Sequence, residues 1–258
     1  FGFIRMLRQM ASVWAPSHWV VTFDGGLPEK RLALQEDYKA QRKPMPDALR
    51  AQIHLVEEYL DRAEVVRVRQ DRQEADDVMA SLATRAEPET DTVLLATGDK
   101  DMYQLVNDKV RVIPVAGKNA VNTAMGPDEV RTKTGVAPTQ IVDWLALTGD
   151  ASDNIPGVPG IGEKTAARLL GQYGSLDRLW KHLDQIAQER VRKALEENRS
   201  LILKNVEMVR LRRDLDCPLD WERMMVRRPD ATPLIAFFER CEFHSMAHEL
   251  SEQSLFPE

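Results

Sequence analysis

Short apolar runs alternate with segments of helical spacing in the first half of the chain. The predicted strands are residues 18–23, 65–68, 92–96 and 110–115. The predicted helical segments are residues 47–60, 75–86 and, as one or two turns, 100–106. Strands that alternate with helices indicate an α/β fold, in which a parallel sheet carries helices on both faces.

The second half of the chain has helical spacing almost throughout. The predicted helices are residues 128–134, 139–147, 164–172, 176–183, 186–196, 199–209 and 233–239. Gly and Pro cluster between Gly149 and Gly162, which separates the two patterns. We therefore expect an α/β domain at residues 1–149 and an all-α region at residues 150–258.

The front of the chain departs from the alternating pattern. Residues 1–11 have the character of the back part of a helix, without an N-cap and without a strand before it. An α/β sheet usually opens with a strand, so we expect that the chain starts inside its first βα unit and is truncated.

Composition narrows the class of protein. The 258 residues are 29% charged and 43% hydrophobic, and no apolar run approaches the roughly 20 residues that span a bilayer. Cys217 and Cys241 lie in no metal-ligand spacing, which favours a reduced, cytoplasmic protein without membrane contact. The net charge of −6 argues mildly against nucleic-acid binding. It is an average over the chain, however, and basic residues gather at 39–43, 190–193 and 210–213.

Carboxylates stand where predicted strands end or helices begin. They are Asp24, Glu74, Asp76, Asp77, Asp99, Asp101, Asp150 and Asp153. Ligands of parallel sheets bind at the carboxyl ends of the strands, so the groups at 24, 74–77 and 99–101 should converge on one edge. Carboxylates this close repel one another unless cations neutralise them, and oxygen-only ligands suit Mg²⁺ or Mn²⁺. Two such ions about 3.5–4 Å apart are a known device for displacement at phosphate.

Each of these groups also has an explanation that needs no metal. The carboxylates of residues 74–77 can meet the dipole of a helix, and Asp99 can cap the helical turn after it. Asp150 and Asp153 can belong to a solvated turn. The metal hypothesis rests on all the groups together.

A glycine-rich string at residues 155–166 (IPGVPGIGEKTA) is the second chemical signal. Gly157, Gly160 and Gly162 allow a tight turn and close approach of a ligand to the backbone. The following helix offers free N–H groups, with Lys164 and Thr165 in its first turn, and such helix ends bind phosphate. The alternative is a plain αα-corner whose glycines serve packing, but the length of the string favours DNA-backbone binding without sequence specificity.

These motifs together resemble a known family. The resemblance rests on residues 23–24, 74–77, 97–105, 147–157 and 160–166, in that order. They are similar to the 5′-nuclease domain of bacterial DNA polymerase I, which belongs with the flap endonucleases, and the similarity runs from Phe1 to about Leu250. The resemblance implies a nuclease domain of the PIN and flap-endonuclease type, followed by a helix–hairpin–helix at 155–173. It also implies structure-specific 5′-3′ exonuclease and flap-endonuclease action on DNA, in replication primer removal and repair.

The resemblance further implies roles for single residues. Asp24, Glu74, Asp76 and Asp99 would serve a first Mg²⁺, with Asp77 close by, while Asp101, Asp150 and Asp153 would serve a second. Mn²⁺ would substitute, and a monovalent cation such as K⁺ would sit at the hairpin. A helical arch at 28–45 would carry the catalytic cations Arg31, Lys39 and Arg42 and the DNA-binding Tyr38. The implied partner is DNA with a 5′ flap or 5′ end at a junction of duplex and single strand, bound by a monomer that is fused to or acts with DNA polymerase I.

The sequence departs from the family pattern at two places, and two other functions are alternatives to a nuclease. The family's first strand ends in a further metal-binding aspartate that has no counterpart here, and Gly25-Gly26 stands where relatives often carry a small residue and Lys. A magnesium-dependent phosphatase of the haloacid dehalogenase type also uses a D-x-D pair such as Asp99-Lys-Asp101, but it does not explain the hairpin. A module that binds branched DNA without cutting it is the other alternative.

Overall fold

The computed structural model describes residues 1–117 and 120–255, and the chain forms two compact units that are interleaved in sequence. Unit 1 comprises Phe1–Phe23, Lys43–Val68 and the described residues from Pro218 onward. Unit 2 comprises Asp24–Arg42 and Arg69–Cys217. No helix among the described residues is long and apolar enough to cross a bilayer.

Unit 1 is built on a small aromatic core. Its elements are α1 (Gly2–Trp14), β1 (Val20–Phe23), α3 (Asp47–Arg62), β2 (Val66–Arg69), α11 (Trp221–Met224), α12 (Ala231–Arg240) and α13 (His244–Leu255). The ring of Tyr59 on α3 lies 6.1 Å from that of Phe237 and 6.0 Å from that of Phe238, both on α12. These rings remove a large apolar area from water, which holds α3 and α12 together.

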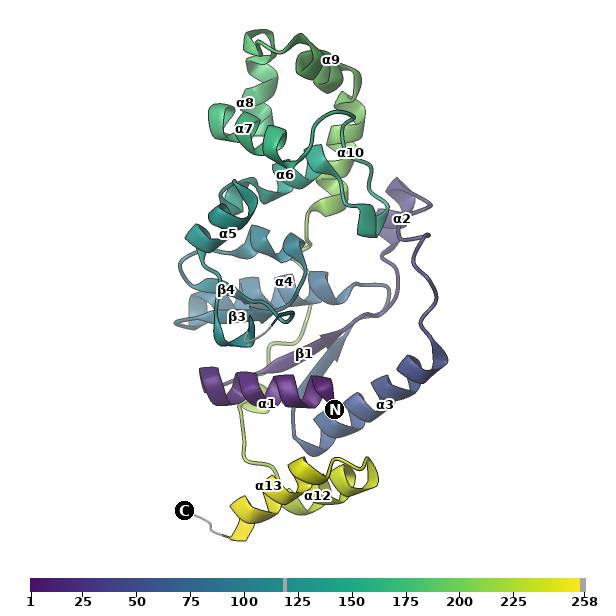
Figure 1. Cartoon of the computed structure of the whole chain (residues 1–258), viewed down its shortest axis with the longest axis vertical. Coiled ribbons are helices and arrows are strands. Elements are labelled where there is room, and N and C mark those ends of the chain that lie inside the picture. Colours follow the sequence, from purple (N-terminus) through teal and green to yellow (C-terminus); the bar gives the residue numbers. More distant parts are fainter. Residues whose placement is uncertain (118–119, 256–258) are drawn as a thin grey trace. The chain divides into compact units, whose positions relative to one another are not determined.

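Unit 2 has the larger apolar core. Its helices are α2 (Glu29–Leu34), α4 (Ala75–Ala86), α5 (Pro127–Thr134), α6 (Ile141–Thr148), α7 (Glu163–Tyr173), α8 (Leu176–Lys181), α9 (Glu189–Glu197) and α10 (Arg199–Val209), and its strands are β3 (Val93–Ala96) and β4 (Val110–Ile113). Short 3₁₀ helices are η1 (Glu87–Glu89), η2 (Lys100–Leu105), η3 (Ala120–Asn122), η4 (Pro138–Gln140), η5 (Ala151–Asp153) and η6 (Leu183–Gln185). Helix α6 is apolar on almost every side because it packs against α7, α10 and η2. Figure 1 shows it beside α7 and α10.

The strands pair differently from the expectation of one sheet. Strand β1 pairs with β2, and β3 pairs in parallel with β4, from Val93 opposite Val110 to Ala96 opposite Ile113. The described strands thus form two two-stranded sheets. Each strand has four residues, at the short end of the usual range, so each ladder has few hydrogen bonds.

The predicted elements are otherwise close to those observed. The segment predicted at 100–106 is the 3₁₀ helix η2, and residues 2–11 belong to α1 as expected. Within 28–45 the structure has the short helix α2, followed by turns at residues 36–41. Helices α11 and α13 were not predicted, because neither has an apolar stripe that is strong enough in sequence.

One face of α4 holds an extended segment at residues 210–217. Asp77 Oδ1 accepts from the backbone N–H of Arg212 at 2.9 Å, and the Ser81 hydroxyl donates to the carbonyl of Arg212 at 3.2 Å. Arg85 donates to the carbonyl of Cys217. Residues four apart lie on the same helix face, so the three side chains form one row along α4. This row joins the 210–217 segment to α4.

Candidate active site

Four carboxylates surround the beginning of α4. Asp24 accepts a hydrogen bond from the backbone N–H of Ala75, the first residue of this helix, at 2.8 Å. Glu74 is the N-cap residue, Asp76 lies in the first turn, and Asp99 follows β3. Burial raises the pKa of Asp76 to about 7, together with the negative charges of Asp99, Glu74 and Asp24. The four carboxylates that were expected to serve one ion are therefore near enough for the charges of Asp24, Glu74 and Asp99 to act on Asp76.

A second group surrounds Asp101 at the start of η2. Burial raises the pKa of Asp101 well above its ordinary value, and the charges of Asp99, Asp150 and Asp153 raise it further. Asp101 Oδ1 is buried and has no hydrogen-bond partner among the described residues. A buried acceptor without a partner is costly, which suits an atom that would bind a cation. Asp101, Asp150 and Asp153 are the set that was expected to serve the second ion.

Two of the carboxylates also cap short helices, which the alternative explanation held for Asp99; Asp150 and Asp153, expected there in a solvated turn, are buried. Asp99 accepts from the backbone N–H of Asp101 at 2.9 Å. Asp150 accepts from the backbone N–H of Ser152 at 2.8 Å and from its hydroxyl at 2.5 Å. Burial alone would raise the pKa of Asp150, but these bonds and the charge of Lys100, 3.5 Å away, hold it below its ordinary value. Capping and metal binding use different lone pairs of a carboxylate, so one does not exclude the other.

Cations of the chain itself contact these carboxylates. Lys39 pairs with Glu74 and lies 3.4 Å from Asp153, and Arg42 Nη2 lies 2.5 Å from Asp153 Oδ1. Among the described residues, no three His, Cys, Asp or Glu side chains are arranged to hold a metal ion. The donor chemistry nevertheless fits hard divalent cations, because both groups offer oxygen alone. We refer to the eight carboxylates as the carboxylate site.

Arg31 forms the most buried ion pair of this site. It is 6% exposed and donates to Asp77 Oδ2 at 2.6 Å and Asp77 Oδ1 at 2.9 Å, and it also pairs with Glu74. Its Nε donates to the carbonyl of Met208 at 2.9 Å. Burial would lower the pKa of Arg31, but the bonds and charge of Asp77 raise it, so the guanidinium stays charged. Asp77 is fully buried and its oxygens are taken by Arg31 and the backbone of Arg212.

Tyr38, expected at a DNA-binding surface, is 3% exposed. Its hydroxyl donates toward Glu74 at 3.1 Å and Asp153 at 3.0 Å, so it bridges the two carboxylate groups. Burial raises the pKa of Tyr38 strongly, and both carboxylates add to this shift, so the hydroxyl remains a donor. Its contacts here are with the carboxylate site.

Further contacts at the site were not foreseen from sequence. Gln35 Nε2 donates to the carbonyl of Asn154 at 2.6 Å, and Gln41 Nε2 donates to that of Ala151 at 2.7 Å. They bind the segment after α2 to the loop that carries Asp150 and Asp153. The sequence could have revealed Lys100 as a site residue, because it lies between Asp99 and Asp101. It contains no feature that would have revealed the two glutamines.

Gly25 owes its identity to close packing of two backbone segments. A Cβ at Gly25 would lie 1.7 Å from the carbonyl oxygen of Gln70. The N–H of Gly25 donates to the carbonyl of Gln73 at 2.8 Å. The two segments that lead to Asp24 and Glu74 are thereby held side by side, which accounts for glycine at this position.

The three glycines of the hairpin differ in what requires them. A Cβ at Gly157 would lie 2.1 Å from the carbonyl oxygen of Thr148, so packing requires this glycine. Gly160 has φ +82, a left-handed turn conformation. A Cβ at Gly162 would meet nothing within 4 Å. The packing explanation holds for Gly157 alone.

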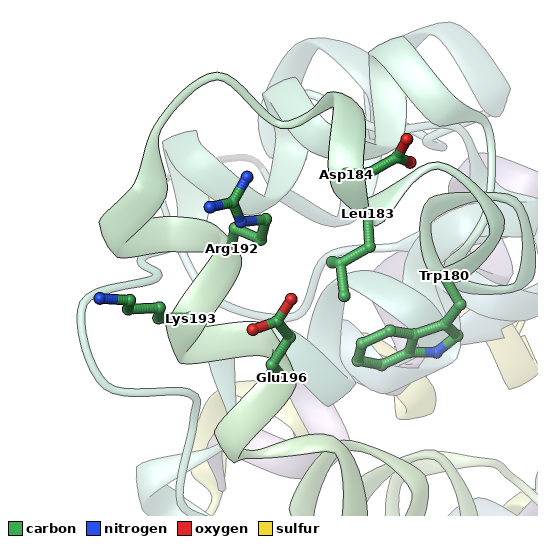
Figure 2. Close-up of a pocket in the computed structure, with 6 residues that line it drawn as sticks. All are labelled: Trp180, Leu183, Asp184, Arg192, Lys193 and Glu196. Carbon is green, nitrogen blue, oxygen red and sulfur yellow. The ribbon is translucent and has the colours of Figure 1, made fainter.

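Gly162 precedes α7, whose first N–H groups have no side-chain cap. Lys164 is exposed and Thr165 is half-buried, both in the first turn of this helix. We refer to Gly157, Gly160, Gly162, Lys164 and Thr165 as the hairpin site. A separate pocket has a volume of about 510 Å³ and includes none of the predicted site residues. Figure 2 shows its lining residues, which are Trp180, Leu183, Asp184, Arg192, Lys193 and Glu196.

Both carboxylate groups and the hairpin fall within two matching family models. Residues 1–135 match the 5′-3′ exonuclease N-terminal resolvase-like domain, and residues 136–232 match the 5′-3′ exonuclease C-terminal SAM fold. The chain belongs to the 5′-3′ exonuclease family. The family and fold class predicted from sequence are confirmed, while the division at residues 149 and 150 stays a prediction.

Other members of this 5′-3′ exonuclease family include parts of much longer proteins. The thermostable DNA polymerase I of Thermus filiformis is 42% identical over 230 residues, which are 89% of this chain and 27% of that protein. DNA polymerase I of Bacillus subtilis is 33% identical over 255 residues, 98% of this chain and 29% of that protein. The chain thus spans less than a third of the length of these curated relatives.

Solved structures of similar fold support the same architecture. The T5 5′-exonuclease with bound divalent metal ions (zinc) has a TM-score of 0.67 and 23% identity, covering 80% of this chain and 79% of its own. The catalytic core of Rad2 in complex with DNA substrate has a TM-score of 0.62 and 16% identity, covering 96% of this chain and 82% of its own. At these identities the likeness concerns the fold.

Proposed function

We propose that this chain is a structure-specific 5′-3′ exonuclease and flap endonuclease that hydrolyses phosphodiester bonds in DNA with two divalent metal ions. The observation that carries the proposal is the gathering of two carboxylate groups, around Asp76 and Asp101, in a member of the 5′-3′ exonuclease family. Arg31, Lys39, Arg42 and Lys100 pair with members of this site, but the eight carboxylates outnumber them. The excess of negative charge calls for further cations at the site.

The metal ligands are proposed as the two groups predicted from sequence. Asp24, Glu74, Asp76 and Asp99 would hold one Mg²⁺, and Asp101, Asp150 and Asp153 would hold the other, with Mn²⁺ as a substitute. Such ions, when bound, activate a water molecule for attack and stabilise the charge on the leaving oxygen. Asp77 has a different role in this proposal, because its oxygens are engaged by Arg31 and Arg212.

The cations in and after α2 have two proposed roles. Lys39 and Arg42 lie at Asp153, with side chains that are 11% and 51% exposed. Arg42 would meet a phosphate that comes to the carboxylate site, and Lys39 would act on it from a more buried position. Their charges would stabilise the negative charge that builds up on the phosphate. Arg31 donates to protein groups from a buried position, so we assign it to the orientation of Glu74.

The hairpin site would bind the backbone of duplex DNA. Gly162 leaves the N-terminal N–H groups of α7 open, and Lys164 and Thr165 add a charge and a hydroxyl. Such contacts position DNA without reading its sequence. A K⁺ ion at the hairpin, as the family implies, belongs to the same proposal.

The biological setting is proposed from the relatives. Since those relatives are named DNA polymerase I, the chain would act in primer removal and repair, in the cytoplasm, as a monomer fused to or working with a polymerase. Its substrate would be DNA with a 5′ flap or 5′ end at a junction.

Cleavage of a labelled 5′-flap duplex tests the proposal. The 258-residue chain is incubated with the duplex in Mg²⁺ and, in parallel, in EDTA, while binding is followed by fluorescence anisotropy in both. Release of the flap in Mg²⁺ alone is expected. Binding in both buffers without cutting would instead support a branched-DNA-binding module, and hydrolysis of small phosphomonoesters alone would support the phosphatase.

A further inference from the structure

Arg190, at the start of α9, lies against the tip of the hairpin. Its guanidinium atoms are the nearest side-chain atoms to Gly160, with Nη2 3.6 Å from where a Cβ would stand. Arg190 is exposed, and among the described residues no carboxylate pairs with it. A free guanidinium thus stands beside the turn that leads into α7.

Arg168 ties α7 to the same end of α9. Its Nη2 donates to Gln188 Oε1 at 2.7 Å, and Gln188 is the N-cap residue of α9. Arg168 also follows Lys164 by four residues, so the two exposed side chains lie on one face of α7. Three links therefore place these side chains in one region. Helix α7 joins Lys164 to Arg168, Gln188 joins Arg168 to the start of α9, and Gly160 lies beside Arg190.

The charge of this patch is positive and accessible. Lys164, Arg168 and Arg190 are all exposed, and the nearby Glu189 is already paired with Lys193 at 2.9 Å. Glu163 remains as an opposing charge in the first turn of α7. Guanidinium groups donate in a planar fork that matches phosphate oxygens, so the patch is suited to a phosphate backbone.

We propose that Arg190 and Arg168 bind phosphates of the duplex DNA that occupies the hairpin site, so that the backbone-binding surface extends from the N-terminus of α7 onto α9. This inference rests on the proposed function of the hairpin. It adds two residues to that surface and predicts that the DNA passes over the start of α9.

Arg192 offers a matched control on the same helix. It follows Arg190 by two residues, about 200° around an α-helix. It lines the pocket that also contains Trp180 and Glu196 (Figure 2). Arg192→Ala removes the same charge from α9 and leaves the hairpin face intact.

The test is the salt dependence of duplex binding by the 258-residue chain, measured by anisotropy with the wild type, Arg190→Ala, Arg190→Lys, Arg192→Ala and Lys164→Ala. Each phosphate contact contributes about 0.9 to the slope of log K against log salt. Arg190→Ala is expected to weaken binding several-fold and to reduce the slope by about 1. Arg190→Lys should keep the slope, and Arg192→Ala should leave both affinity and slope unchanged. Thermal melting checks the fold of each variant, and Arg168→Ala provides a second reading if Arg190→Ala melts early.

The possible failures are distinguishable. An unchanged slope in Arg190→Ala and Arg168→Ala, with a reduced slope in Lys164→Ala, would overturn this inference and leave the hairpin site standing. Equal losses in Arg190→Ala and Arg192→Ala would also overturn it, because the effect would then be one of overall charge. Failure of the wild-type chain to bind duplex would remove the proposed function of the hairpin itself.

Discussion

The carboxylate site and the hairpin site are both proposed to handle phosphate, yet they are built in opposite ways. The carboxylate site holds buried charges in ion pairs, such as Arg31 with Asp77. The hairpin site presents open backbone at Gly162 and an exposed cation at Lys164. The charged groups of the carboxylate site are therefore mostly buried, whereas the phosphate-binding groups proposed for the hairpin site are exposed.

This difference sets what a mutation can reveal. A residue in a buried pair contributes to stability as well as to function, since removal of one partner leaves the other charge uncompensated. An exposed residue can be removed at little cost to the fold. Changes at the carboxylate site should therefore affect both properties, whereas most changes at the hairpin site should affect binding alone.

The largest expected effect is on turnover. Asp153→Asn should lower the rate of flap cleavage by on the order of 10³-fold, about 4 kcal/mol, because it removes the charge of a proposed metal ligand while keeping the side-chain volume. Duplex affinity should stay near the wild-type value, as measured by anisotropy. Equal loss of binding and cleavage would contradict a metal role and remove the contrast between the two sites.

Arg31→Met tests the buried pair as a stabilising element. The change leaves Asp77 and Glu74 without their shared cation, so we expect a loss of about 3 kcal/mol in the free energy of unfolding. Urea denaturation measures this loss, with Lys164→Ala as the exposed counterpart that should change stability by less than about 0.5 kcal/mol. Similar losses of stability in the two variants would show that the buried and the exposed cation do not differ in their contribution to the fold.

Two glycines of the hairpin separate packing from ligand binding. Gly157→Ala forces a Cβ to within 2.1 Å of the Thr148 carbonyl, and we expect a loss of about 2 kcal/mol in unfolding free energy. Gly162→Ala meets open space and should leave the melting temperature nearly unchanged. If Gly162→Ala proved as destabilising as Gly157→Ala, the hairpin would be a packing element throughout.

Asp76→Asn tests the effect of buried negative charge on the stability of the carboxylate site, and its expected effect is smaller. The pKa of Asp76 is about 7 in the fold, above its ordinary value, so the folded chain holds this proton more tightly than the unfolded chain. Its contribution to stability is therefore present at low pH and is lost as pH rises from about 4 through 7. In EDTA at pH 8 the Asn variant should be more stable by about 1 kcal/mol, or a few degrees in melting temperature. If the melting temperature of the wild-type chain in EDTA did not fall over this pH range, the raised pKa of Asp76 would be refuted.

Sequence periodicity predicted most elements because their signals are local. The apolar alternation at residues 92–96 and the helical spacing at 75–86 depend on neighbours in the chain, and β3 and α4 formed there. The pairing of strands into two separate sheets depends on partners far along the chain, and it was not foreseen. Helices α11 and α13 lacked a local signal of sufficient strength.

The sequence by itself determined the chemical types at the site and their order: eight carboxylates at element ends, a basic segment after α2 and a glycine-rich hairpin. The tertiary structure alone decided which charges meet. Arg31 pairs with Asp77, 46 residues away, and Arg42 with Asp153, 111 residues away. Such pairings follow from how the chain returns on itself, and no local pattern encodes them. The same reason made Tyr38 a buried bridge between Glu74 and Asp153, a contact that its place in a basic segment did not reveal.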